Sequence, residues 1–461
     1  MNRDIKSWGI QTVNPATGAD LAFHPFIEDN AVDGVLQRAA LGFETWRDMG
    51  MAARLELLKQ FGAAIESAKE NLARQASIEM GKPITQSLAE IDRCVQLTRW
   101  IVENTPRILT PREVNIPTGR AWLRFDPVGT VFGITPWNFP FYQIIRAAVP
   151  IMAGGNGYLV KPAECTMQCG LMLNDIAASV GMGDVFIAAN FRREQSRQII
   201  QDKRIAGVAL TGSVAAGRAI SQLAGEAGKK TVMELGGSDP FIILADADLE
   251  KAVDGAVASR FGNAGQVCIA AKRFIIDESI AEDFSDRFAE RIAAIQPGDP
   301  LDRETFLGPM SRIDLRDALH KQVQMAVKEG AKLVVGGSKP RQPGAWYAPT
   351  LLTDVTPEMA CFREELFGPV ACVIVAKDTD DAIRLANDSD FGLSSSLWTK
   401  DLAKAERLAG EIEAGAVNIN KGSSSDPNLP IGGIKASGYG RELTEFGLLE
   451  FMNIKPVWAA T

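Results

Sequence analysis

Histidine is scarce in this sequence: only His24 and His320 occur among its 461 residues. A Ser-His-Asp hydrolase needs a histidine beside its nucleophile, and a histidine-ligated metal site needs several histidines together. The sequence therefore disfavours both kinds of site, and we expect no metal centre.

Long apolar runs are also missing. A membrane-spanning helix needs roughly 18 consecutive apolar residues, and the most apolar segment, residues 144–160, is interrupted by Arg146, Pro150 and three glycines. The charged start at residues 1–4 is not followed by the apolar stretch of a secretory signal. We therefore expect neither a secretory signal nor a membrane partner.

Positive charge and cysteine are limited as well. Lysine and arginine number 49 against 57 aspartates and glutamates, and the net charge of −8 argues against a nucleic-acid partner. Six cysteines without regular spacing indicate reduced thiols rather than a disulfide framework. These features predict a cytoplasmic protein.

The composition that is present, 46% hydrophobic and 23% charged, is typical of a globular chain. A chain of this length is too long for one core, so we expect two large domains and a small element. Apolar residues recur at helical spacing in 51–74 and 84–103. From residue 130 onwards, β-rich segments alternate with helical ones, which predicts parallel sheets in an α/β fold.

Two alternating series meet near Gly236 and Gly237, where we place the main boundary. The predicted strands are 130–134, 157–161, 204–210 and 231–235, then 241–244, 273–276, 370–375, 394–398 and 416–419. The predicted helices are 213–227, 248–261 with Asp248 as its N-cap, 281–295, 380–387 and 402–412. Residues 112–125 and 450–461 look extended and fit neither series, so we expect a hairpin or tail used in oligomerisation.

Cys268 follows a glycine-rich bend, Gly-Asn-Ala-Gly-Gln-Val at 262–267. Backbone N–H groups in such a bend can point at a reacting atom, and the start of a helix there would lower the pKa of the thiol. A nucleophile is one interpretation. A small buried hydrophobe, as we expect for Cys94, Cys361 and Cys372, is the other.

Glu234 ends an apolar strand and precedes a pair of glycines. A carboxylate placed in a cleft at this point would be partly desolvated, and its raised pKa would suit a general base. On the pattern alone, a strand-end charge that faces water is the simpler interpretation.

Asn138 lies in a turn, Pro-Trp-Asn-Phe-Pro at 136–140, which two prolines and two aromatic residues make rigid. A rigid turn can hold the side-chain amide as a donor to an oxyanion. The turn can equally be a loop in which Asn138 satisfies only its own backbone.

Residues 211–217, Thr-Gly-Ser-Val-Ala-Ala-Gly, join a predicted strand to a predicted helix. Free N–H groups at the helix start, together with the Ser213 hydroxyl, suit a pyrophosphate. The segment is neither a G-x-G-x-x-G fingerprint nor an ATP-binding loop, and an ordinary serine N-cap would have the same pattern.

Lys161 and Glu164 leave the carboxyl end of another strand. Ligands bind at this edge of parallel sheets, so both side chains could hydrogen-bond ribose hydroxyls. A solvated ion pair is the alternative.

The types, order and spacing of these motifs together resemble the aldehyde dehydrogenase superfamily. The matching segments are Pro-Trp-Asn-Phe-Pro at 136–140, Lys-Pro-Ala-Glu at 161–164, Thr-Gly-Ser at 211–213, Glu-Leu-Gly-Gly at 234–237, Gly-Gln-Val-Cys at 265–268, Glu-Leu-Phe-Gly-Pro-Val at 365–370 and Gly-Gly-Ile-Lys-Ala-Ser-Gly at 432–438. The resemblance covers essentially the whole chain.

The resemblance implies the aldehyde dehydrogenase fold. In it, an NAD-binding Rossmann-like parallel-sheet domain would comprise 1–108 and 128–236, and an α/β catalytic domain would comprise 237–435. A small β oligomerisation element would comprise 109–127 and 450–461, and the chain would form a homodimer or homotetramer.

The resemblance also implies roles for single residues. Cys268 would be the nucleophile and Glu234 the general base, while Asn138 and the backbone N–H of Cys268 would form an oxyanion hole. The cofactor would be NAD, with NADP less preferred, because Glu164 would bond the ribose 2′-hydroxyl and repel a 2′-phosphate. The implied cofactor-binding residues are Ile134, Trp137, Lys161, Pro162, Ala163, Glu164, Gly212, Ser213, Leu235, Phe367 and Glu365, the last of which would hold the nicotinamide ribose.

More narrowly, residues 234–241, 307–310, 314–317 and 453–458 are similar to the short bacterial succinate-semialdehyde dehydrogenases. This similarity implies oxidation of succinic semialdehyde to succinate through a thiohemiacetal and a thioester on Cys268. Arg146 and Ser425 would bind this small-molecule aldehyde.

Two positions depart from the pattern of these enzymes; the first bears on the substrate, and the second argues only against a redox switch. Gly262 stands where a second carboxylate-binding arginine is expected, and Ala270 replaces a regulatory cysteine. An NAD-dependent dehydrogenase of another small aliphatic or aromatic aldehyde is therefore the alternative. A CoA-acylating semialdehyde dehydrogenase shares the nucleophile, but Glu234 favours hydrolysis.

Overall fold

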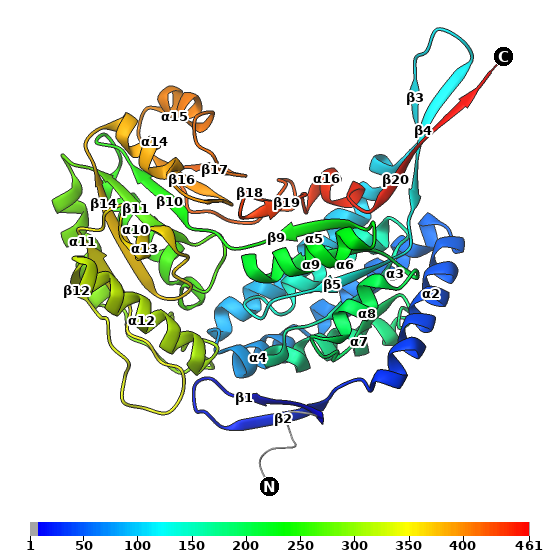
Figure 1. Ribbon diagram of the computed structural model, residues 1–461, viewed down its shortest axis with the longest axis horizontal. Coiled ribbons are helices and arrows are strands. Elements are labelled where there is room, and N and C mark those ends of the chain that lie inside the picture. Colours follow the sequence, from blue (N-terminus) through cyan, green and yellow to red (C-terminus); the bar gives the residue numbers. More distant parts are fainter. Residues whose placement is uncertain (1–7, 461) are drawn as a thin grey trace.

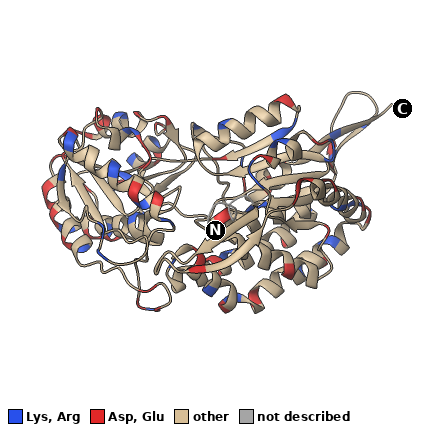
Figure 2. Cartoon of the chain, turned by 60° about the horizontal axis from the view of Figure 1, so that its bottom comes forward, with Lys and Arg blue, Asp and Glu red and all other residues tan. Residues whose placement is uncertain are grey.

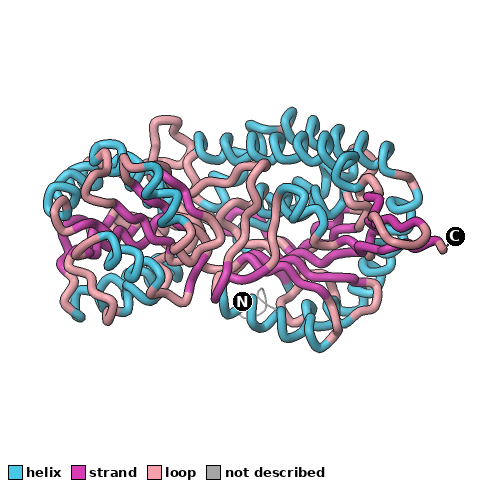
Figure 3. The backbone as a smooth tube through the Cα atoms, turned by 90° about the horizontal axis from the view of Figure 1, so that it is seen from above, coloured by secondary structure: helices cyan, strands magenta, loops and turns pink. Residues whose placement is uncertain are grey.

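The computed structural model describes residues 8–460 and consists of two α/β lobes with a narrow arm on one of them (Figure 1). Residues 1–4, which the expectation about a secretory signal concerns, lie outside the described residues. Strands run through the interior of each lobe and helices cover them, as seen from above in Figure 3. Acidic and basic residues are interspersed along both lobes (Figure 2). Within residues 8–460, no helix is both long enough and apolar enough to span a bilayer.

The first lobe contains a six-stranded sheet in the order β19-β9-β8-β5-β6-β7. Its strands are β5 (Thr130–Ile134), β6 (Gly157–Lys161), β7 (Phe186–Ala188), β8 (Ile205–Thr211), β9 (Lys230–Glu234) and β19 (Gly438–Tyr439). Only the β19–β9 pair is antiparallel. Because both faces are covered, the strands are continuous apolar runs, and β6 is buried throughout. The four strands predicted here are confirmed to within one residue.

Helices and one hairpin surround this sheet. They are β1 (Gly9–Val13), β2 (Asp20–Pro25), η1 (Asp29–Ala31), α2 (Val32–Asp48), α3 (Met51–Ser67), α4 (Lys69–Met80), α5 (Ile84–Leu109), α6 (Tyr142–Ala153), η2 (Glu164–Thr166), α7 (Met167–Ser179), α8 (Gln195–Gln201), α9 (Val214–Glu226) and α16 (Thr444–Leu449).

The segment 51–74, where apolar residues recur at helical spacing, is helical but is divided between two helices. The chain leaves helical geometry at Ala68 (φ −91°, ψ 5°) and continues as a second helix, α4. Both helices bury their apolar faces in the same core as α5, so the apolar spacing continues across the bend and does not reveal it.

The second lobe contains a seven-stranded sheet in the order β12-β13-β14-β11-β10-β16-β17. Its elements are β10 (Asp239–Ile243), α10 (Leu249–Phe261), η3 (Gly262–Gly265), β11 (Ala271–Asp277), α11 (Ala281–Ala293), α12 (Ile313–Glu329), β12 (Lys332–Val335), β13 (Thr350–Thr353), α13 (Ala360–Arg363), β14 (Val370–Ala376), α14 (Thr379–Asn387), β15 (Phe391–Gly392), β16 (Ser395–Trp398), α15 (Leu402–Ala409), β17 (Val417–Ile419) and β18 (Ile434–Lys435). The predicted elements are confirmed to within three residues, and the Asp248 side chain accepts the N–H of Lys251 as the expected N-cap. The sequence patterns missed α12, β12, β13 and α13.

The arm is a three-stranded antiparallel sheet of β3 (Arg112–Val114), β4 (Arg120–Pro127) and β20 (Met452–Ala459). The two segments expected to be extended therefore pair with each other over eight residues of β20. Trp458 (68% exposed) and Ile454 (51% exposed) leave apolar surface on the arm.

A buried ion pair fixes the start of α6. The fully buried Lys82 and Glu90 are paired, and the second carboxylate oxygen of Glu90 accepts the N–H groups of Phe141 (2.8 Å) and Tyr142 (2.9 Å). A carboxylate at a helix N-terminus also interacts favourably with the helix dipole. Glu90 on α5 thereby positions the turn that precedes α6.

Removing this carboxylate should destabilise the first lobe strongly. Glu90→Ala leaves Lys82 buried without its partner, so we expect the free energy of unfolding to fall by about 3–5 kcal/mol. Glu56→Ala, which breaks the exposed pair with Lys59, should cost less than about 1 kcal/mol. Urea unfolding followed by tryptophan fluorescence measures both, and equal losses would contradict the assignment.

Candidate active site

A cavity of about 530 Å³ lies between α5, α6 and the loop that follows α10. Cys268 lies on its wall, and the loop at 423–425 closes another side. Other side chains around the cavity are Phe139, Tyr142, Gln143, Arg146, Asn263 and Phe306.

The loop that carries Cys268 has an unusual backbone. Asn263, Ala264 and Gly265 all have positive φ (53°, 51° and 69°), which reverses the chain between α10 and β11. A side chain at Gly265 would place Cβ 2.3 Å from the carbonyl oxygen of Gly368, so only glycine fits. The fully buried Arg260 donates to the carbonyl oxygens on both sides of the bend, those of Gly265 and Ala271.

The expectation that Cys268 begins a helix is wrong, and so is the expected fall in its pKa. The residue lies in a turn before β11. Burial raises the pKa of the thiol to about 11; Arg146 and Lys272 oppose this rise, and Glu234 adds to it. The thiol is therefore neutral at pH 7 and needs a base to become a nucleophile.

Glu234 at the end of β9 is 3% exposed. Burial raises the pKa of this carboxyl group to about 8, which Arg146 opposes and Glu442 reinforces. Among the described residues its Oε1 atom has no hydrogen-bond partner. The group has the raised pKa predicted from the sequence and a vacant acceptor atom, two properties that a general base requires.

Arg146 on α6 is 3% exposed and forms an ion pair with Glu442. Burial lowers the pKa of the guanidinium, but Glu442 and Glu234 raise it by more, so the net change is upward. The positive charge of Arg146 is therefore permanent and already partnered. Sequence reasoning missed Glu442, because no pattern in the neighbouring residues predicts that it contacts Arg146 on α6.

Asn138 follows β5 and is buried beside the nucleophile loop. Its Nδ2 donates to the carbonyl oxygen of Gln266 at 3.0 Å, and the Asn263 side chain donates to the carbonyl oxygen of Asn138 at 2.9 Å. The turn predicted at 136–140 is thus bonded through Asn138 to the loop that carries the thiol.

The carboxyl ends of β5, β6, β8 and β9 form the edge where the sequence predicts a dinucleotide. The strand order reverses between β5 and β8, which is where such sheets bind nucleotides. Ile134, Lys161 and Leu235 lie at this edge.

The start of α9 lies at the same edge. The Ser213 hydroxyl accepts the N–H of Ala216 at 3.2 Å as an N-cap, which leaves earlier N–H groups of the helix for an anion. A Cβ at Gly217 would lie 2.5 Å from the Leu235 side chain, so glycine lets α9 pack against the end of β9. Gly212 precedes the cap and has room around it. This geometry fits a pyrophosphate.

The other predicted cofactor residues surround this edge. The rings of Trp137 and Phe367 meet edge to face at 5.7 Å. Lys161 Nζ lies 3.9 Å from Glu164 Oε1, whose side chain is 48% exposed, and Pro162 and Ala163 connect them.

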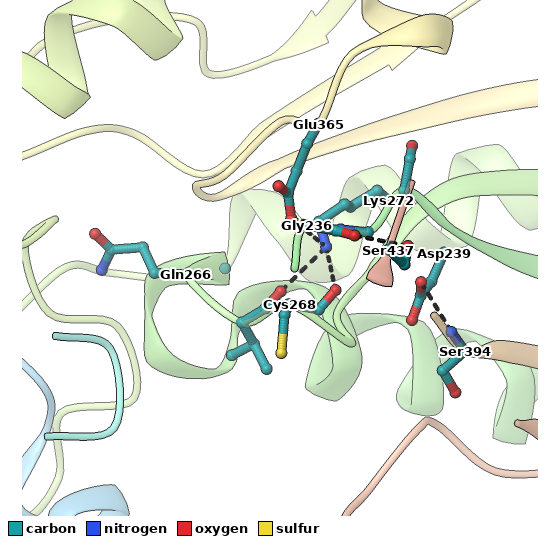
Figure 4. Close-up of polar contacts among 12 residues, drawn as sticks. Gly236, Asp239, Gln266, Cys268, Lys272, Glu365, Ser394 and Ser437 are labelled. Carbon is teal, nitrogen blue, oxygen red and sulfur yellow. Dashed lines mark hydrogen bonds and ion pairs between the residues drawn. The ribbon is translucent and has the colours of Figure 1, made fainter. Parts of the chain in front are cut away.

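Glu365 accepts the N–H of Gly237 at 3.1 Å and pairs with Lys272 at 3.2 Å (Figure 4). Lys272 is a further residue that sequence reasoning missed, although a lysine four residues after the nucleophile could have raised the question.

Ser425 lies on the cavity wall, where its hydroxyl and that of Tyr142 are 2.7 Å apart. Arg93 of α5 also lines the cavity. In the described part of the chain, no carboxylate lies within 4.0 Å of Arg93, in contrast to Arg146. Sequence reasoning named Ser425 but missed Arg93.

The aldehyde dehydrogenase family model matches residues 3–457. The chain belongs to the aldehyde dehydrogenase family. It is 47% identical to the succinate semialdehyde dehydrogenase [NAD(P)+] Sad of Escherichia coli K12, over 97% of both chains. It is 40% identical to succinate-semialdehyde dehydrogenase [NADP(+)] 1 of Mycobacterium tuberculosis, over 98% of this chain and all of the other.

The fold is shared with solved structures. The succinic semialdehyde dehydrogenase of Streptococcus pyogenes, crystallised with NADP+, superposes with a TM-score of 0.96 at 33% identity, covering 98% of this chain and all of the other. The predicted family, fold and class of enzyme are confirmed. The roles of single residues stay predictions.

Proposed function

We propose that this enzyme oxidises succinic semialdehyde to succinate with NAD or NADP. The observation that carries the proposal is a cavity lined by the Cys268 thiol and two arginines, Arg93 and Arg146. The raised-pKa carboxyl group of Glu234 acts electrostatically on this thiol, and the buried amide of Asn138 bonds to the loop that carries it. The names of the two curated relatives support the same substrate.

In the proposed reaction, Glu234 takes the proton of the Cys268 thiol, and the sulfur attacks the aldehyde carbon. The Asn138 amide and the N–H of Cys268 stabilise the negative oxygen that forms. Lys161, Ser213 and Glu365 would help to hold the dinucleotide, which would supply the acceptor for the hydride. Loss of that hydride from the thiohemiacetal leaves a thioester on Cys268. Glu234 releases that proton to solvent and then accepts a proton from water. The resulting hydroxide attacks the thioester carbon, and the acid leaves as the Cys268 thiolate is regenerated.

We propose a preference for NAD over NADP. The exposed carboxylate of Glu164 can accept from a ribose 2′-hydroxyl and repels a 2′-phosphate. Lys161, 3.9 Å away, partly offsets that repulsion, so the preference should be moderate.

The substrate carboxylate needs a cation that has no other partner. Arg146 is paired with Glu442, whereas Arg93 lines the cavity without such a pair in the described residues. We infer that Arg93 supplies the charge missing at Gly262, and that Ser425 and Tyr142 add hydroxyl donors. The partnered state of Arg146 and the glycine at 262 favour the alternative, an uncharged small aldehyde.

We also propose that copies of the chain associate through the arm and work in the cytoplasm. The exposed apolar residues Ile454 and Trp458 support the first statement. The second is supported by six cysteines that are all free thiols.

A substrate panel tests the function. Succinic semialdehyde should give a kcat/KM at least about tenfold above that of butanal, an uncharged aldehyde of matched length. NAD should be preferred to NADP, and Cys268→Ser should show no NADH formation by absorbance. Equal rates with both aldehydes would favour the alternative substrate, and activity in Cys268→Ser would refute the covalent route.

Arg93→Ala should separate recognition from catalysis. Loss of a hydrogen bond to a charged group costs about 1.5–3 kcal/mol, so kcat/KM for succinic semialdehyde should fall by about tenfold to a hundredfold. Butanal should be unaffected, and Arg99→Ala, an exposed site on the same helix, should leave both unchanged. Arg146→Ala should slow both aldehydes, because it leaves Glu442 unpaired beside Glu234. If Arg146→Ala lowers kcat/KM for succinic semialdehyde but not for butanal, Arg146 rather than Arg93 binds the substrate carboxylate.

The pH profile should report Glu234. Its ionised form, the base, is present above a pKa of about 8 and is lost as the pH falls through that value. The value of kcat/KM should therefore rise with pH to a plateau, with a midpoint near 8. Glu234→Gln should lower kcat by about 10²–10⁴-fold and remove this limb, whereas Glu56→Gln should keep it. An unchanged midpoint in Glu234→Gln would show that another group is the base.

A further inference from the structure

Lys272, at the start of β11, is a buried lysine directly behind the nucleophile loop. It is 1% exposed, and its ammonium group donates to the carbonyl oxygens of Val267 (3.1 Å) and Cys268 (2.6 Å) and pairs with Glu365 (3.2 Å) (Figure 4). A lysine has three protons to donate, and all three have acceptors here. Two of these acceptors belong to the peptide groups on either side of the nucleophile.

Glu365 is held against the same cluster from its other side. It accepts the N–H of Gly237, and a Cβ on Gly236 would lie 2.4 Å from its Oε2 atom. A Cβ on Gly237 would lie 3.0 Å from the carbonyl oxygen of Cys268. The glycine pair therefore leaves room for one carboxylate to pack against the nucleophile peptide.

Lys272 has Glu365 as its only carboxylate partner within 4.0 Å among the described residues. Asp239 is the next acid: burial raises its pKa to about 7, and the charge of Lys272 opposes that rise. The charge of the buried ammonium is thus compensated mainly by Glu365.

We propose that Lys272 is a positioning residue that ties Glu365 to the peptide of Cys268, so that occupation of the nicotinamide ribose site changes the reactivity of the thiol. The proposal rests on the proposed function, in which Glu365 binds that ribose. When the Glu365 carboxylate turns toward the ribose hydroxyls, its bond with Lys272 weakens. The positive charge of Lys272 is then less neutralised and acts more strongly on the loop that carries Cys268.

The charges around the thiol fix the direction of this change. Arg146 and Lys272 lower the pKa of Cys268, whereas Glu234 and Glu365 raise it. Moving Glu365 away while Lys272 stays should make the thiolate easier to form. The bound dinucleotide would thereby prepare the nucleophile before the aldehyde arrives.

Alkylation of Cys268 by iodoacetamide, followed across pH with and without NAD, tests this coupling. If the nicotinamide ring merely shields the thiol, the alkylation rate at the high-pH plateau changes. If the thiolate forms more easily, the pH midpoint of the alkylation curve moves. In the unmodified chain, NAD should lower the pH midpoint of alkylation. At a pH below that midpoint, the alkylation rate divided by the plateau rate should be at least about threefold higher with NAD than without it.

Lys272→Met keeps the length of the side chain and removes its charge, so the NAD-dependent shift should vanish and the kcat for succinic semialdehyde should fall. Lys272→Arg should restore part of the shift. Lys251→Met, on an exposed lysine paired with Asp248, should behave as the unmodified chain. A full shift in Lys272→Met would overturn the proposal.

Glu365→Gln is a second test of the proposal, because it removes the carboxylate but keeps Lys272 and its bonds to the two carbonyl oxygens. It should also abolish the shift, even if Lys272→Met does not fold, and a full shift in Glu365→Gln would refute the tie. If the enzyme oxidises succinic semialdehyde but neither variant changes the NAD-dependent shift of the alkylation midpoint, the proposed role of Lys272 is refuted and the proposed function stands. Failure of the unmodified chain to bind NADH, measured by its fluorescence, overturns the proposed function instead.

Discussion

The two carboxyl groups that share Arg146 set the chemistry of the cavity. Both Glu234 and Glu442 are buried, and burying a charge is costly unless an opposite charge compensates it. The single guanidinium forms its ion pair with Glu442, and Glu234 keeps a pKa near 8. Glu442 thereby serves as the ion-pair partner of Arg146, while Glu234 can accept and release a proton near neutral pH.

The same rule of compensation shapes the walls around these groups. Glu90 neutralises Lys82 and anchors the turn before α6. Arg260 donates to two backbone carbonyl oxygens, those of Gly265 and Ala271, and so holds the positive-φ bend at 263–265. Glu90 and Arg260 thus each bond to backbone groups of a segment next to a site residue. The loops are therefore rigid because charges that cannot reach water must keep their bonds.

Much of this architecture could be predicted from the sequence, because strands such as β6 and helices such as α10 carry local periodic signals. The bend at Ala68 could not, because the apolar spacing continues through it. In the site, Cys268, Glu234 and Asn138 stand in short recognisable motifs. Glu442, Lys272 and Arg93 do not, because their roles depend on partners that only the folded chain brings near. The lowered pKa expected for Cys268 failed for the same reason: desolvation depends on tertiary packing.

The antiparallel pairing of β19 with β9 places Gly438 and Tyr439 against the strand of Glu234. Glu442 follows β19 within a few residues. During synthesis the segments before residue 438 emerge before β19 and Glu442. Until the C-terminal segment docks, Arg146 has no Glu442 and β9 remains an edge strand. Residues 438–442 thus complete the surroundings of the base, so a chain synthesised only as far as residue 437 carries its thiol without a complete site.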